Sequence, residues 1–123
     1  MATLFERLGG REGIERIVGT VVEAHLQNPT IAKRFQPLTR EPDRMKVVTG
    51  HLCDFLDEGS GGTARYAGKS MPDAHFGMNV SGEEFLAATD DIMQSLERHD
   101  VDEATRKDVL FIVYSLKPQI VGL

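Results

Sequence analysis

The chain has 123 residues, the length of one domain, and its 41% hydrophobic and 27% charged residues are typical of a globular protein with a packed core. This composition excludes a disordered chain. The net charge of −5 disfavours nucleic-acid partners, whose phosphates bind clustered lysine and arginine side chains. We therefore expect a single domain over residues 1–123, with one functional site and no nucleic-acid partner.

The N-terminal residues mix charged and apolar side chains and contain no long apolar run. This pattern predicts neither a signal peptide nor a membrane-spanning helix, so we expect a cytoplasmic protein without a membrane partner. Cys53 is the only cysteine, which rules out a disulfide bond within the chain.

Two stretches in the first half of the chain show the three- and four-residue spacing of an amphipathic helix. Apolar side chains recur at this spacing over residues 14–22, and Pro29 ends the pattern. A second apolar stripe, within residues 42–59, consists of Val48, Leu52, Phe55 and Leu56. His51 lies on the same stripe, so the spacing alone predicts that its side chain points inward.

Two further helices are predicted in the second half. Ser81 and Glu84 have the spacing of a capping box, and a periodic apolar pattern follows them up to Leu96. A last periodic segment covers residues 109–116, and Pro118 ends it. No strand-like alternation is present, so the sequence predicts an all-α fold, and a four-helix bundle satisfies the same pattern.

The stretch between the second and third predicted helices, residues 59–70, holds four glycines and shows no helical periodicity. Such a stretch predicts an irregular segment at the protein surface. It leads directly to His75.

Five short motifs follow one another along the chain: Leu4 to Gly10, Asn28-Pro29 with Phe35, Gly61 to Tyr66, Met71 to His75, and Gly77 to Val80. In this order and spacing they resemble the motifs of group I truncated hemoglobins, and the resemblance covers residues 4–121. It implies an all-α truncated globin fold, a two-over-two helical sandwich around heme b (iron protoporphyrin IX). With one cysteine, the chain lacks the CxxCH motif of covalent attachment, so the heme is expected to bind noncovalently.

His75 ends the motif that, by this resemblance, carries the proximal ligand of the heme iron. Neutral imidazole is a common iron ligand in globins, and a backbone carbonyl can fix its other ring nitrogen. An isolated histidine is more often a surface or core residue, and here the surrounding motif reverses that interpretation.

The side of the heme opposite His75 departs from the family pattern. Group I members usually carry a phenylalanine followed by a tyrosine in the first long helix, and the matching residues are Val21 and Val22. Leu52 stands where the family often has glutamine, and Val48 lies one turn before it. None of these side chains can donate a hydrogen bond to dioxygen, so simple oxygen storage is poorly supported.

His51 is the polar side chain left on this inward stripe. A few family members use the matching position as a second iron ligand, so the resemblance supports a resting state in which His75 and His51 both bind iron. Dioxygen, carbon monoxide or nitric oxide would then bind only after His51 moves away. The alternative is a five-coordinate iron with His51 at the surface or beside a heme propionate.

The resemblance also suggests which other side chains surround the heme. Basic side chains suit the two propionates, and the candidates are Lys46, Arg65 and Lys69. Tyr66 is expected to contact a propionate and the macrocycle edge, while Met71 and Met78 fill space beside the proximal histidine. Apolar cover is expected from Phe35, Phe55, Val80, Phe85, Ile92 and Val113.

Three other reactive side chains have simpler interpretations. His25 lies on the apolar stripe of the first helix, where a core or interhelix histidine is expected. His99 lies at a helix end beside Asp100, which favours a capping or surface position. Cys53 is expected to be half-buried, with no catalytic partner.

The sequence thus predicts a monomeric heme protein that binds diatomic gases and has a redox or gated ligand-binding role. Four alternatives stay open. They are a nitric-oxide dioxygenase supplied with electrons by a reductase, a five-coordinate oxygen-binding or oxygen-transport globin, an electron-transfer module, and a heme-free helical interaction domain.

Overall fold

The computed structural model describes residues 2–123, and regular structure in this range is helical apart from one isolated bridge between Val80 and Val121. In chain order the helices are α1 (Leu4–Arg7), α2 (Gly10–Gln27), α3 (Ala32–Phe35), the 3₁₀ helix η1 (Gln36–Arg40), α4 (Pro42–Gly59), α5 (Met71–His75), α6 (Gly82–Arg98), α7 (Glu103–Ser115) and the 3₁₀ helix η2 (Lys117–Gln119). The predicted all-α class is confirmed. None of these helices is long and apolar enough to cross a bilayer.

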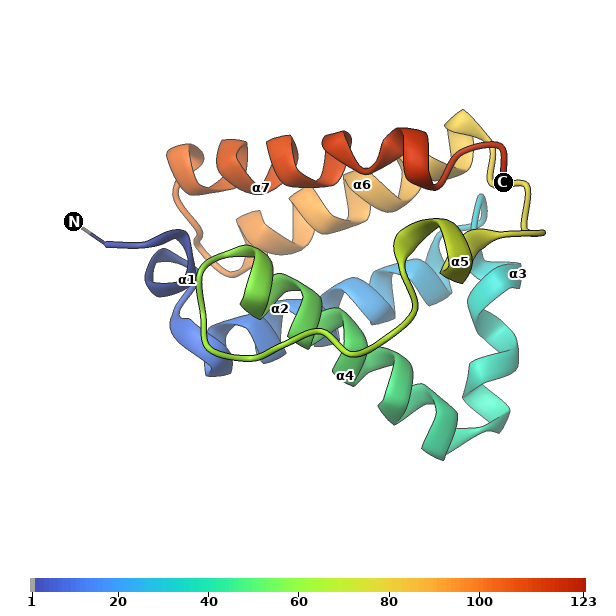
Figure 1. The fold of residues 1–123 in the computed structure, drawn as a ribbon, viewed down its shortest axis with the longest axis horizontal. Helices are drawn as coiled ribbons and strands as arrows, with labels where there is room; N and C mark the ends of the chain where they lie inside the picture. Colours follow the sequence, from blue (N-terminus) through green and yellow to red (C-terminus); the bar gives the residue numbers. More distant parts are fainter. Residues whose placement is uncertain (1) are drawn as a thin grey trace.

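The four long helices form two layers (Figure 1). In this view α6 and α7 lie side by side in the upper layer, and α2 and α4 lie together below them. α2 contacts both α4 and α6, so it joins the two layers. The short helix α5 lies at the same end of the molecule as the C-terminus. This arrangement is the two-over-two sandwich that the resemblance to group I truncated hemoglobins implies.

The core lies where the periodic apolar residues of the helices meet. Ile14 and Val18 of α2 are 0% and 2% exposed, and Leu96 of α6 is 2% exposed. Val109 and Val113 of α7 complete the same cluster. Because burying a side chain of this size contributes about 1.5–3 kcal/mol, these predicted stripes supply much of the driving force for folding.

The corner between α1 and α2 requires glycine. Gly9 and Gly10 have φ angles of 92° and 68°, in the left-handed region that glycine adopts without strain. A Cβ atom on Gly13 would lie 2.1 Å from the carbonyl oxygen of Leu8, so the two helices can approach only with glycine here.

The segment between α4 and α5 is irregular, as predicted, and runs back along α4 (Figure 1). The N–H of Gly62 donates to the carbonyl oxygen of Asp57 at 2.8 Å. The buried carboxylate of Asp57 accepts from Arg11 of α2 at 3.2 Å, so its charge is paired. These bonds fix the start of the segment, and further along the N–H of Tyr66 donates to the carboxylate of Glu58 on α4 at 3.2 Å.

Candidate functional site

His75 is the last residue of α5, a short helix capped by Ser70. The Ser70 hydroxyl oxygen accepts a hydrogen bond from the N–H of Asp73 at 3.2 Å. Nδ1 of His75 lies 2.8 Å from the carbonyl oxygen of Met71. A carbonyl oxygen can only accept, so Nδ1 is the donor in this bond, and in a neutral ring Nε2 is then the nitrogen with the lone pair. The half-buried ring therefore offers one nitrogen for coordination.

Contacts from two sides fasten the segment that follows α5. Arg34 of α3 donates to the carbonyl oxygen of Met78 at 3.0 Å and forms an ion pair with Glu84 of α6. On the other side, the N–H of Gly77 donates to the carbonyl oxygen of Leu123 at 2.7 Å. Arg34 and the C-terminal residues thus hold the chain just beyond the candidate proximal histidine.

Glu84 of α6 is the acidic partner of Arg34. Its carboxylate accepts hydrogen bonds from Arg34 and from the N–H of Ser81, the latter at 3.1 Å in the predicted capping box. These bonds, above all those from Arg34, lower the pKa of Glu84 to about 2. The sequence interpretation found the capping box but missed Arg34, whose partners lie 44 and 50 positions away in the chain.

The apolar stripe predicted on α4 stays largely outside the hydrophobic core. Among the residues that the structure describes, Leu56 packs against the core cluster, whereas Val48, Leu52 and Phe55 do not belong to it. Leu52 is 37% exposed, and the other two are half-buried. A helix that leaves such a face uncovered fits a protein that binds a large apolar ligand there.

His51 lies on this stripe, outside the core cluster, and contacts the segment that runs along α4. Its ring meets the ring of Tyr66 edge to face, with centroids 5.7 Å apart, and Phe55 meets the same ring at 5.6 Å. The hydroxyl of Tyr66 donates to the carbonyl oxygen of Lys69 at 2.6 Å, which fixes the tyrosine. Within residues 2–123, no hydrogen bond occupies either ring nitrogen of the half-buried His51.

These features fit a heme. His75 presents a free Nε2, and beside it Met78 is still 36% exposed. Across residues 2–123, no three His, Cys, Asp or Glu side chains gather into a site for a bare metal ion. A flat apolar cofactor that carries its own iron needs only one or two protein ligands, together with apolar cover.

The predicted apolar cover divides into residues of the core and residues outside it. Val80, Phe85 and Val113 belong to the buried core cluster, and Ile92 packs against it. The ring of Phe35 lies against that of His25, with centroids 4.9 Å apart and the planes tilted by 36°. Their contacts with heme, like those of the half-buried Met71, stay predictions.

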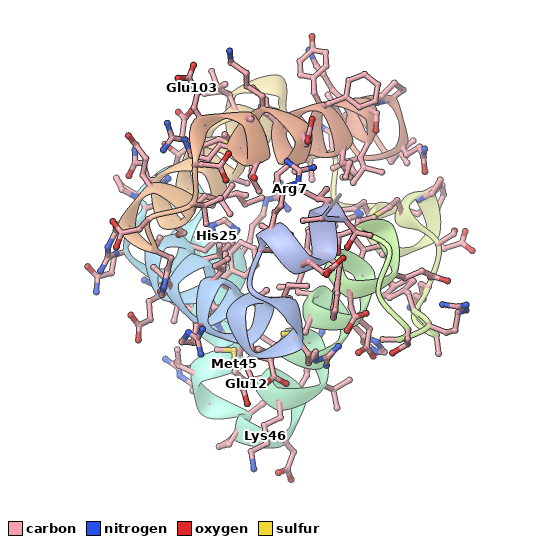
Figure 2. All side chains as sticks on the ribbon, turned by 90° about the vertical axis from the view of Figure 1, so that its left-hand side faces the viewer. Arg7, Glu12, His25, Met45, Lys46 and Glu103 are labelled. Atoms are coloured by element: carbon pink, nitrogen blue, oxygen red, sulfur yellow. The ribbon has the colours of Figure 1, made fainter. Side chains whose placement is uncertain are left out.

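The three basic candidates lie in two different places. Arg65 and Lys69 are exposed on the segment after α4, with Nε of Arg65 3.7 Å from a carboxylate oxygen of Glu58. Lys46 instead lines a hollow between α2 and α4, and its side chain projects from the lower edge of the molecule in Figure 2. It lies about 200° around the helix from Val48, so the geometry gives no support to a propionate contact of Lys46.

The histidine of the first long helix is an interhelix residue, as predicted. His25 is 6% exposed, and its Nδ1 lies 2.7 Å from Oδ2 of Asp91 on α6. Asn28 also donates to Asp91, at 3.1 Å. Figure 2 shows His25 inside the molecule. This pair ties α2 to α6 and thereby holds the two layers together.

Two further predictions concern His99 and Cys53. His99 caps α6, as expected, and its Nε2 lies 2.7 Å from the hydroxyl oxygen of Thr20. The prediction of a half-buried Cys53 is wrong, since the side chain is buried against α2. Burial raises the pKa of its thiol, which makes it less reactive.

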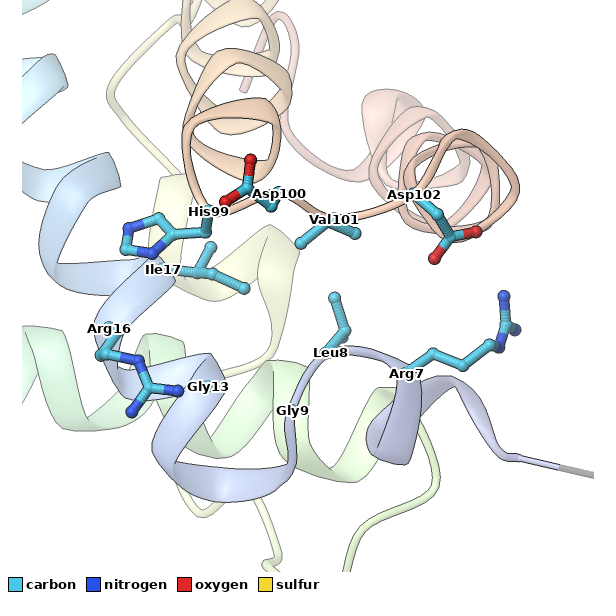
Figure 3. Close-up of a pocket in the computed structure, with 10 residues that line it drawn as sticks. All are labelled: Arg7, Leu8, Gly9, Gly13, Arg16, Ile17, His99, Asp100, Val101 and Asp102. Atoms are coloured by element: carbon cyan, nitrogen blue, oxygen red, sulfur yellow. The ribbon is translucent and has the colours of Figure 1, made fainter.

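A second hollow, of about 250 Å³, lies between the α1–α2 corner and the turn from α6 to α7 (Figure 3). Leu8, Ile17 and Val101 line it together with two arginines and two aspartates. Arg7 is already paired with Asp108 at 2.7 Å. The charges around this hollow balance, and neither candidate iron ligand lines it, so it lies apart from the candidate site.

Comparisons with known proteins agree with this geometry. The family model described as bacterial-like globin matches residues 3–121. The group 1 truncated hemoglobin GlbN of Synechocystis sp. is 31% identical over 107 residues, which cover 84% of this chain and 82% of that protein. The group 1 truncated hemoglobin of Tetrahymena pyriformis is 27% identical over 120 residues, which cover 98% of this chain and 95% of the relative.

Solved structures share the fold. The truncated hemoglobin of Tetrahymena pyriformis in its Fe(III) form has a TM-score of 0.89 at 24% identity, covering 99% of this chain and 100% of that one. A two-over-two hemoglobin of Synechococcus sp. has a TM-score of 0.82 at 24% identity, with 96% and 95% covered. This chain belongs to the bacterial-like globin family as a truncated hemoglobin, and the family implies a heme cofactor with diatomic gas ligands.

Proposed function

We propose that this chain binds heme b and through it diatomic gases, with His75 as the proximal ligand of the iron and His51 as the second ligand at rest. The observation that carries this proposal is the 2.8 Å hydrogen bond between Nδ1 of His75 and the Met71 carbonyl oxygen, which leaves Nε2 free. When bound, heme supplies an iron centre that binds dioxygen, carbon monoxide or nitric oxide and exchanges single electrons.

The surroundings of His75 suit a ligand that is ordered before the cofactor binds. The bond to Met71 fixes the orientation of the ring and raises the basicity of Nε2. The Ser70 cap holds the start of α5, and Arg34 holds Met78 beyond its end. Because the ring needs little further ordering, less entropy is lost when Nε2 binds iron.

Three features support His51 as the second ligand. It lies on the face of α4 that the core leaves uncovered. Its ring nitrogens have no hydrogen-bond partner within residues 2–123, so iron would not compete with one. Its neighbours on the stripe, Val48 and Leu52, are apolar, which leaves imidazole as the basic group of this face.

His51 would then act as a gate. Its ring has to leave the iron before a gas can bind, so the rate of gas binding depends on this movement. The edge-to-face contact with Tyr66 contributes about 0.5–1.5 kcal/mol to one position of the ring. Gated gas binding or electron transfer suits such a site better than oxygen storage. A reductase partner and a cytoplasmic location stay predictions.

A five-coordinate oxygen-binding globin is the second candidate. One observation favours it: the ring of His51 is only half-buried and can remain near the surface beside Tyr66. Val22, Val48 and Leu52 would then form an apolar wall facing the gas, without a hydrogen-bond donor.

Heme titration of His75→Ala tests the proposal. Heme-free wild-type protein should take up one heme per chain, and His75→Ala should release heme more than tenfold faster. Even removal of a group that only supports a metal ligand costs about 10- to 100-fold. His99→Ala is the matched control and should behave like the wild type, because His99 bonds Thr20 far from the site. If His75→Ala retains heme with an unchanged spectrum, the proximal assignment is wrong.

A further inference from the structure

The outer face of α7 presents apolar side chains to solvent. Phe111 is 78% exposed, Tyr114 is 61% exposed and Leu110 is 38% exposed. Residues three and four positions apart lie on one side of a helix, so these three side chains form a continuous stripe, called here the α7 stripe. Val109 and Val113 of the same helix are buried, so the helix packs into the fold without using the stripe.

Two aromatic rings on a free surface call for an explanation. Single exposed apolar residues are common, but contiguous apolar patches mark interaction surfaces, and Phe and Tyr are enriched in them. α7 lies at the outer edge of the upper layer, with α6 on its inner side (Figure 1). Within residues 2–123, no element covers the α7 stripe.

Opposite charges frame the α7 stripe at its two ends. Glu103 begins α7 and projects outward there (Figure 2). Lys107 follows one turn later, with its Nζ 3.2 Å from the carboxylate of Glu103. At the other end, Lys117 lies over the ring of Tyr114, with its Nζ 5.5 Å from the ring centroid. From the start of α7 to just beyond its end, the side chains of the outer face are therefore acidic, basic, apolar, aromatic and basic, in that order.

We propose that the α7 stripe joins two copies of this chain, with their α7 helices antiparallel about a two-fold axis near Leu110 and Phe111. This arrangement brings Glu103 of each copy beside Lys117 of the partner subunit and packs the apolar centre of the stripe against itself. A surface that pairs with its own copy in this way is what a two-fold dimer requires.

The charges at the two ends of the α7 stripe favour antiparallel over parallel α7 helices. A parallel pair would place Glu103 beside Glu103 of the partner subunit and both Lys117 side chains together, which costs energy through like-charge repulsion. An antiparallel pair also sets opposite ends of the two helix dipoles side by side. The self-complementary pattern thus points to a second copy of the chain rather than to a different partner.

The area of the α7 stripe limits how tightly two copies of the chain can bind each other. α7 has 13 residues and is about 20 Å long. A contact along one such helix buries less than the roughly 800 Å² per partner of a standard stable interface. We therefore expect a weak dimer. At low concentration it dissociates into the monomer that the sequence predicts.

Light scattering after size-exclusion chromatography tests the dimer on heme-loaded protein between about 5 and about 500 μM. The wild-type mass should rise from that of one chain of 13.6 kDa with its heme toward twice that value as concentration increases. Phe111→Glu should keep the mass of one heme-loaded chain throughout. Val47→Glu is the control, because Val47 is 57% exposed on α4, and it should dimerise like the wild type. A wild-type mass that never rises, or a rise that Phe111→Glu leaves unchanged, overturns the proposal.

Exchange of the two end charges tests the orientation. Glu103→Lys and Lys117→Glu should each raise the concentration of half-dimerisation by about fivefold, because each change affects two symmetric contacts. The double variant, with both charges exchanged, should return toward the wild-type value. If the double variant is as weak as the single ones, the antiparallel arrangement is wrong. Neither test depends on which residues bind heme.

Discussion

Replacement of Glu84 by glutamine removes the charge that pairs with Arg34 and keeps the size of the side chain. A carboxyl group whose pKa falls from 4.5 to about 2 on folding contributes at most about 3.4 kcal/mol to stability. The side chains of Arg34 and Glu84 are 30% and 19% exposed, so solvent screens part of their attraction. We therefore expect Glu84→Gln to lower the free energy of unfolding by about 1 to 2 kcal/mol.

The pH dependence follows from the direction of this shift. The pKa of Glu84 is lower in the folded than in the unfolded chain, so its contribution is fully present above about pH 5. The contribution is lost as the pH falls from 4.5 toward 2. The difference between wild type and Glu84→Gln should therefore be clearly smaller at about pH 3 than at about pH 7.

Urea unfolding of the heme-free protein, followed by circular dichroism, measures this difference at both pH values. Glu83→Gln is the matched control, because Glu83 is an exposed neighbour in the same helical turn, and it should change stability by less than about 0.5 kcal/mol. Equal stability of wild type and Glu84→Gln near neutral pH, or a difference that does not vary with pH, would show that the ion pair does not hold this segment.

Two other substitutions test the distal wall and the core. Val22→Tyr places a hydroxyl where the family usually has one and should slow oxygen release about tenfold in stopped-flow measurements, since a hydrogen bond contributes roughly 1.4 kcal/mol. Val22→Phe is its control, and equal rates in the two variants would mean that residue 22 does not face the gas. Leu96→Ala should lower the free energy of unfolding by about 2–5 kcal/mol, because the side chain is 2% exposed. Leu86→Ala, at a position 60% exposed, should cost far less, and similar losses in both would contradict the described core.

The long helices can be predicted from sequence because each buries one face, and burial of one face imposes a three- and four-residue period. The capping box of Ser81 and Glu84 is equally local and was therefore predictable. The start of α7 could not be predicted in this way. Its first residue, Glu103, lies six positions before Val109, where the periodic pattern begins. There the side chain of Asp102 accepts from the N–H of Thr105 at 3.2 Å and begins the helix.

Only part of the candidate site can be predicted from local sequence patterns. His75 and His51 are marked by a motif and by a stripe, but the contacts of Arg34 and Leu123 join distant parts of the chain, which spacing does not encode. The predicted propionate contact of Lys46 rests on its basic side chain, and its angle around α4 separates it from the stripe. Cys53 follows Leu52 by one position, and that turn of about 100° carries it from the uncovered stripe into the core.

The most direct test of bis-histidine ligation is the absorption spectrum of the heme-loaded protein without added ligand, in the ferric and the ferrous state. We expect a low-spin spectrum in both states, and a high-spin spectrum for His51→Leu, whose side chain cannot bind iron. Carbon monoxide should bind His51→Leu in one fast phase, whereas the wild type should show a slower phase limited by the movement of His51. His99→Leu is the control and should match the wild type. A high-spin wild-type spectrum at neutral pH, or spectra and kinetics that His51→Leu leaves unchanged, would contradict ligation by His51.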